Sequence, residues 1–207
     1  DANGWGGNKK LTPDDAYRFA KGETITAHNG MKVRLNKPLD FLVVADHAIY
    51  IGLLPGLYAK DPLLLKTAEG SHWLRALQQA EANPSQARDI LTKGGLSDYK
   101  KVGGDAFLQS VWQEVVARAD LHNNSGQFTA FSGYEWTAAN GDFARSAYSS
   151  AYHRVVIFKD SADRVGQVLP FSTLDSNDPE ALWAYLEDYQ QQTGGEVLAI
   201  PHNSNLS

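Results

Sequence analysis

The chain has 207 residues, 43% of them hydrophobic, and a formal net charge of −5 at pH 7. This length and apolar content suit one domain with its own core, and the acidic balance argues against nucleic-acid binding, which needs clustered lysine and arginine. Because the chain contains no cysteine, disulfides, thiolate catalysis and cysteine-ligated zinc are all excluded. Any bound metal would have to be held by histidine, aspartate and glutamate.

The N-terminal region contains a strong helix start. Thr12 supplies an N-cap hydroxyl, Pro13 suits the first helical position, and two acids follow near the positive end of the helix dipole. We expect this helix to stop at Gly22. A tight turn at Asn29-Gly30 then predicts a pair of short strands on either side of it.

A buried strand and a long helical region come next. The run FLVVA, residues 41–45, is wholly apolar and typical of a buried parallel strand. Residues 53–122 then show apolar side chains three and four apart, which predicts an inserted helical layer or a lid. In the last helix of this region, the residues expected on one face are Phe107, Val111, Val115 and Ala119.

The C-terminal third alternates strands with a helix. FTAFSGYEWT, HRVVIFKD and VLAI read as strands, and PEALWAYLEDYQQQ reads as an amphipathic helix that begins after Asp178 and ends at Gly194. Strands that alternate with helices predict an α/β class with a mainly parallel sheet or barrel. No apolar run approaches the roughly 20 residues of a transmembrane helix. The chain opens with what looks like the middle of a loop and stops just past a strand, so we expect residues 1–207 to be a single, partial domain.

Polar side chains follow three of these predicted strands. Asp46 and His47 come directly after FLVVA, Glu135 lies near the end of FTAFSGYEW, and His202 follows VLAI and a proline. Because the carboxyl ends of parallel strands meet at one edge of a sheet, we expect these groups to lie together. His153 instead begins its strand, HRVVIF, and joins them if that strand runs antiparallel to FTAFSGYEW.

A carboxylate grouped with several imidazoles is the ligand set expected for catalytic Zn²⁺, Mn²⁺ or Fe²⁺. A glutamate can bridge two metals about 3.5–4 Å apart, and such a pair generates hydroxide near neutral pH. The predicted metal ligands are His47, Glu135, His153 and His202. Asp46 has two possible roles, as a ligand or as the group that orients a histidine through its ring N–H. The remaining histidines, His28, His72 and His122, are interpreted as surface or hydrogen-bonded side chains.

The sequence contains, in order, LDFLVVADH, GYEW followed by HRVVIF, and VLAIPHN. This series resembles the polymerase-and-histidinol-phosphatase (PHP) superfamily of metallohydrolases. With LTPDDAYRFAKGE and AIPHNSNLS, it is most similar to the bacterial family known as domain of unknown function 3604. The resemblance covers most of the chain and is weakest over residues 53–122.

The resemblance implies a distorted (β/α)7-type barrel, incomplete at both ends here, with two or three divalent metal ions at the strand ends. It matches His47 to the strand-ending Asp-His motif, Glu135 to the bridging glutamate, and His153 and His202 to two further ligands. Two family features are absent, an opening His-x-His strand and a late Asp-x-His pair. They would lie before Asp1 and after Ser207, so this chain holds about half of the implied centre.

The favoured function is a metal-dependent phosphoesterase, because superfamily relatives hydrolyse phosphomonoesters with a metal-activated hydroxide. In this interpretation Asp46 or His202 handles the proton, and Arg154 and Asn203 contact a phosphorylated small-molecule substrate. Strand alternation nevertheless turns Arg154 away from His153. Two alternatives stay open: a non-catalytic module that binds a metal or ligand, and a hydrolase of another ester, a sulfate or an amide. Relatives of the closer family often carry export signals, which favours the periplasm.

Overall fold

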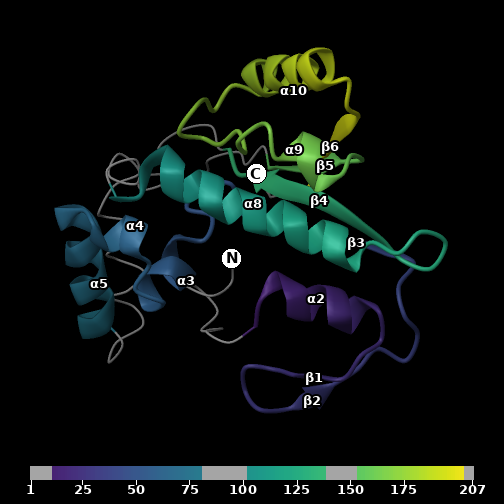
Figure 1. Ribbon diagram of the computed structural model, residues 1–207, viewed down its shortest axis with the longest axis horizontal. Helices are drawn as coiled ribbons and strands as arrows, with labels where there is room; N and C mark the ends of the chain where they lie inside the picture. Colours follow the sequence, from purple (N-terminus) through teal and green to yellow (C-terminus); the bar gives the residue numbers. More distant parts are fainter. Residues whose placement is uncertain (1–10, 81–101, 139–152, 203–207) are drawn as a thin grey trace, which may run out of the picture.

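The structure is a computed structural model, and it describes residues 11–80, 102–138 and 153–202. It is a mixed α/β fold in which helices cover one face of a four-stranded sheet (Figure 1). The helices are α2 (Pro13–Ala20), α3 (Leu53–Tyr58), α4 (Pro62–Leu65), α5 (Ala68–Ala80), α8 (Gly104–His122), α9 (Ala162–Val165) and α10 (Pro179–Thr193). The strands are β1 (Ile25–Thr26), β2 (Lys32–Val33), β3 (Phe41–Val43), β4 (Thr129–Trp136), β5 (Arg154–Phe158) and β6 (Val197–Pro201).

The main sheet has the strand order β3-β4-β5-β6. Only β3 and β4 pair in parallel, whereas β5 is antiparallel to both of its neighbours. The prediction of a mainly parallel sheet is therefore wrong, because two of the three strand pairings in this sheet are antiparallel. Within the described ranges the sheet is open, with β3 and β6 as its outermost strands, and no closed barrel is present.

The N-terminal predictions are confirmed. Helix α2 begins after Thr12, whose backbone N–H donates to the Asp15 carboxylate at 3.0 Å, and Gly22 follows it with a φ of 83°. Strands β1 and β2 form an antiparallel hairpin whose turn contains Gly30 at a φ of 89°. A left-handed φ of this kind is the conformation that glycine adopts without a steric penalty.

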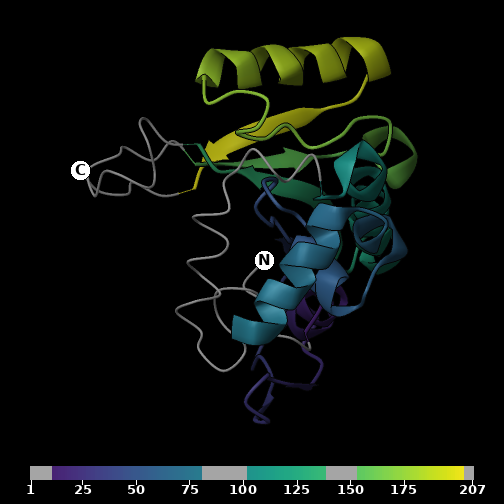
Figure 2. The same ribbon diagram turned by 90° about the vertical axis from the view of Figure 1, so that its left-hand side faces the viewer.

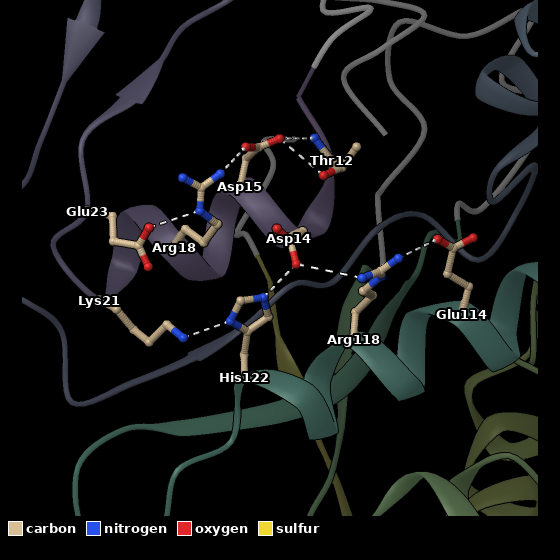
Figure 3. Close-up of polar contacts among 9 residues, drawn as sticks. All are labelled: Thr12, Asp14, Asp15, Arg18, Lys21, Glu23, Glu114, Arg118 and His122. Atoms are coloured by element: carbon tan, nitrogen blue, oxygen red, sulfur yellow. Dashed lines mark hydrogen bonds and ion pairs between the residues drawn. The ribbon is translucent and has the colours of Figure 1, made fainter.

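Helix α2 is fastened to the C-terminal end of α8 by a buried histidine (Figure 3). The His122 Nε2 atom lies 2.8 Å from Asp14 Oδ1, and its Nδ1 atom lies 2.8 Å from Lys21 Nζ. The ring of Tyr17 stacks on the imidazole with 5.1 Å between centroids. Arg118 also approaches Asp14, at 3.9 Å. We call Asp14, Tyr17, Lys21, Arg118 and His122 the α2–α8 joint.

The main core lies between the sheet and the helices α8 and α10, which cover the same face (Figure 2). Its largest buried side chains include Trp112, Tyr134, Trp136 and Phe158. On α8 the buried stripe runs through Phe107, Trp112, Val116 and Ala119, so the predicted face is turned by about one residue. Val111 and Val115 are only partly buried.

The helices α3, α4 and α5 form a second, smaller core. It joins Leu53, Leu57, Leu64 and Trp73 to Phe107, which lies near the start of α8. The predicted helical layer therefore divides into two parts, since α3 to α5 pack around one end of α8 while α8 itself packs on the sheet. Within the described ranges, no helix combines the length and the apolar content needed to cross a bilayer.

Candidate functional site

Three strands of the main sheet end, and one begins, at the same side of the sheet, which we call the sheet edge. Because β5 is antiparallel to both β4 and β6, the strands β3, β4 and β6 all run in the same direction. Their carboxyl ends carry His47, Glu135 and His202, and His153 directly precedes β5 at the same edge. The structure thus brings together the four side chains that the sequence predicted as metal ligands.

Backbone hydrogen bonds continue the sheet beyond the strand ends and hold these residues in register. His47 and Glu135 form a parallel bridge, in which the Glu135 N–H donates to Asp46 O and the Ala48 N–H donates to Glu135 O, both at 2.8 Å. On the other side the His202 N–H donates to His153 O at 3.1 Å. Partners in a sheet place their side chains on the same face, so the pairing directs the His47 imidazole toward Glu135.

The Glu135 carboxylate lies at the centre of the cluster and is only 5% exposed. Its Oε1 atom is 2.7 Å from His153 Nδ1 and 3.4 Å from His47 Nδ1, while Oε2 is 3.6 Å from His202 Nε2. The rings of His153 and His202 stack with an interplanar angle of 13°. We call Glu135 and these three histidines the edge cluster.

The edge cluster keeps Glu135 ionised despite its burial. Burial acts to raise the pKa of this carboxyl, but the hydrogen bonds from His153 and His47 outweigh that effect, and nearby His202 adds to them. The balance holds the pKa of Glu135 well below its usual range. Within the described residues, its ion-pair partners are all imidazoles.

His153 has one ring nitrogen with a partner and one without. Its Nδ1 must donate to Glu135 Oε1, because an ionised carboxylate is only an acceptor. Nε2 is buried and has no hydrogen-bond partner in the part of the chain that the structure describes. Buried polar atoms in proteins are nearly always bonded, so an unpartnered one needs an explanation. An imidazole with N–H at Nδ1 has its lone pair at Nε2, the form in which histidine binds metals.

The donor atoms of the edge cluster are of the types that bind divalent metals, and one of the distances between them also suits a shared metal ion. Two ligand atoms about 2.1 Å from a tetrahedral metal lie about 3.4 Å from each other. The separation of 3.6 Å between Glu135 Oε2 and His202 Nε2 is close to this value. Among the described residues, however, no three such side chains converge on one point as they stand. Side-chain rotations would be needed to bring a third donor into place.

Sequence reasoning missed Thr137 at this site. Its hydroxyl donates to Glu135 Oε1 at 3.2 Å and is in short hydrogen-bond contact with His47 Nδ1. Thr137 lies two residues beyond Glu135, so the alternation of an extended chain places both side chains on one side. That spacing in the stretch GYEWT was the signal that could have identified it.

The other predicted site residues are placed differently. Asp46 contributes its backbone carbonyl to Glu135, and its charge acts on the hydroxyl of Tyr17 in the α2–α8 joint. Arg154 pairs across the sheet with Trp136, on the face opposite Glu135, and its guanidinium donates to His153 O at 2.9 Å. Asn203 lies outside the described residues.

A cleft of about 430 Å³ lies between α8 and the segment that leads into α10, and Ala48 is among its lining residues. Its walls are mainly apolar and include Leu108, Phe171 and Tyr185. The last two rings stack with 5.2 Å between centroids. The cleft provides space for a small apolar group on the helix-covered face of the sheet.

Comparisons with known proteins identify a family but no characterised relative. A search of curated proteins and a search of solved structures each found no match. The model of one family, described as "Protein of unknown function (DUF3604)", matches residues 1–207. The chain therefore belongs to the DUF3604 family.

Proposed function

We propose that this protein is a metal-dependent hydrolase and that phosphoesters are its substrates. The observation that carries the proposal is the edge cluster, in which three imidazoles from separate strands surround one buried, ionised carboxylate. The buried and unpartnered Nε2 of His153 adds a lone pair that no described group uses. A set of nitrogen and oxygen donors without thiolates suits Zn²⁺, Mn²⁺ or Fe²⁺.

Each residue of the cluster has a role in this proposal. Glu135 and the histidines His47, His153 and His202 would hold the metal ions. Bound there, divalent metals would lower the pKa of a water molecule and neutralise charge on a phosphoryl oxygen. Glu135 contributes a permanent negative charge that attracts cations to a buried position. The side chain of His202 is 45% exposed, more than any other member, which suits it to exchange protons with solvent.

We also propose that the sheet is part of a distorted barrel of the PHP type. Support comes from the common direction of β3, β4 and β6 and from the face that carries Glu135. That face has exposed apolar side chains at Phe41, Leu198 and Ile200, as expected if further strands cover it. An experimental structure of the full-length protein should show these three side chains inside a closed barrel. A face covered only by solvent would contradict this part of the proposal.

The function is tested by metal analysis and a substrate screen of the full-length protein. We expect the purified protein to bind Zn²⁺ or Mn²⁺ and to release phosphate from phosphomonoesters when the metal is supplied. His202→Ala should lower both metal content and turnover, whereas the matched variant His28→Ala should change neither. A protein without metal affinity or turnover, or a His202→Ala variant that equals the wild type, would contradict the proposal.

A second candidate function is a binding module without catalysis, and the cleft beside Ala48 favours it. Its apolar walls and stacked aromatic pair resemble a pocket for a small ligand more than a site for a highly charged phosphate. Metal binding without hydrolysis of phosphate, carboxylate or sulfate esters or of amides would support this candidate. Hydrolysis of a non-phosphate ester, a sulfate or an amide would keep the hydrolase and change only its substrate.

A further inference from the structure

We propose that Thr137 is a positioning residue that sets the tautomer of His47 and so decides which ring nitrogen is offered to a metal. The inference rests on the proposed metal site. It concerns the bonds that Thr137 makes in this structure, and it can be tested in the metal-free protein. Thr137 itself would touch neither the metal nor the substrate.

The backbone places Thr137 between the two groups that it joins. The bridge between His47 and Glu135 puts these residues side by side at the sheet edge. Thr137 follows Glu135 by two positions, directly after β4 ends at Trp136, and it is only partly exposed. Its hydroxyl can therefore reach both the His47 ring and the Glu135 carboxylate from one rotamer.

A hydroxyl has one proton to donate, and the two contacts of Thr137 decide where that proton goes. In the 3.2 Å contact the Thr137 hydroxyl is the donor and Glu135 Oε1 is the acceptor, so this contact uses the proton of Thr137. His47 Nδ1 must then be the donor in its own contact with Oγ1. The opposite arrangement would leave lone pairs facing each other across the contact between Thr137 and Glu135.

The chain of bonds runs from His47 Nδ1–H through the Thr137 hydroxyl to Glu135. The 3.4 Å separation between His47 Nδ1 and Glu135 Oε1 further favours a proton on that nitrogen. In this tautomer the lone pair of the His47 ring is on Nε2. Partners of this kind orient metal-binding histidines and raise their basicity, although they do not touch the metal.

Two substitutions separate the hydroxyl from the shape of the side chain. Thr137→Val keeps the branched shape and removes the hydroxyl, while Thr137→Ser keeps the hydroxyl. Thr129→Val is the matched control, because Thr129 begins the strand β4 and Thr137 directly follows its other end. Thermal unfolding of all three variants would show whether any effect comes from loss of the fold.

The first measurement is ¹⁵N NMR of the metal-free protein, with the His47 signals assigned by their loss in His47→Asn. We expect a proton on Nδ1 of His47 in the wild type, in Thr137→Ser and in Thr129→Val. A mixture of tautomers is expected in Thr137→Val. A wild-type His47 with its proton on Nε2, or a Thr137→Val variant with an unchanged tautomer, would overturn the inference.

The second measurement is the affinity for Zn²⁺ or Co²⁺ by calorimetry. Removing an orienting partner typically lowers metal affinity by about 10–100-fold, and we expect a loss of this size in Thr137→Val alone. Equal affinities for Thr137→Val and the wild type would overturn the inference and leave the metal site intact. A wild type that binds no metal would instead overturn the proposed function, and the NMR result would still decide the role of Thr137.

Discussion

The α2–α8 joint and the edge cluster both pair a largely buried histidine with a carboxylate, but the bonding of the imidazole differs between them. His122 is 7% exposed, and each of its ring nitrogens has a partner, with Asp14 at Nε2 and Lys21 at Nδ1. His153 has a side chain that is 12% exposed and one partner, Glu135, leaving Nε2 buried and unbonded within the described residues. A histidine with both ring nitrogens bonded holds two elements of the fold together. A histidine with an unbonded ring nitrogen has a lone pair available, which under the proposed function would bind a metal ion.

The two regions also differ in their charges. In the joint, the full positive charges that act on Asp14 are those of Arg118, at 3.9 Å, and Arg18, and Arg118 itself contacts Glu114 at 3.5 Å. In the edge cluster, the ion pairs of the Glu135 carboxylate among the described residues are all with imidazoles. A bound cation would supply the positive charge that this second region lacks.

The largest expected effects, on metal affinity and on stability, come from replacing the histidine of each region by asparagine. His153→Asn keeps a donor near the position of Nδ1 and deletes Nε2, so we expect at least about a 100-fold loss of metal affinity by calorimetry. Its melting temperature should stay close to that of the wild type, because no bonded atom is lost.

His122→Asn should behave in the opposite way. The shorter asparagine side chain cannot reach Asp14, and the substitution removes the imidazole that stacks on the ring of Tyr17. We therefore expect the unfolding free energy to fall by about 2–3 kcal/mol. Its metal affinity should equal that of the wild type. If both variants lost metal affinity, or both lost only stability, the division between a structural and a functional histidine would be wrong.

The next effect concerns pH and Asp14. The hydrogen bond from His122 holds the pKa of this carboxyl below its usual value of 3.8. A lowered pKa in the folded state means a contribution to stability that is present above the usual pKa and is lost as pH falls through the folded value. The wild type should therefore have a higher unfolding free energy than Asp14→Asn at pH 7. Urea unfolding should show that this difference in free energy becomes smaller below about pH 4. A gap that stayed constant with pH would contradict the ion-paired joint.

The smallest expected effect is that of Lys21→Met. This variant removes the donor to His122 Nδ1 but keeps the bond between Nε2 and Asp14. We expect a loss of about 0.5–1 kcal/mol in unfolding free energy, because the lysine is partly solvated. Metal affinity should not change. A loss as large as that of His122→Asn would show that Lys21, not Asp14, is the main support of the joint.

Local signals in the sequence predicted the elements well. The capping pattern at Thr12 and Pro13 correctly located α2, and Asp178 caps α10, where its carboxylate accepts the Glu180 N–H at 2.9 Å. Such capping signals depend only on residues within four positions of each other, so they can be recognised in the sequence without knowledge of the fold. The apolar strands that end in polar side chains likewise predicted that His47, Glu135 and His202 would share an edge, together with His153 of the antiparallel strand.

Only the tertiary structure decided how the polar groups are used. Nothing near His122 in the sequence distinguishes it from a surface residue, because its partners Asp14 and Lys21 lie more than a hundred residues away. Thr137 gained its role only when the bridge between His47 and Glu135 brought His47 beside it. The sequence by itself determined which donors reach the sheet edge. The strand pairing determined which ring nitrogens are bonded to which partners, because hydrogen bonds between distant segments exist only in the folded chain.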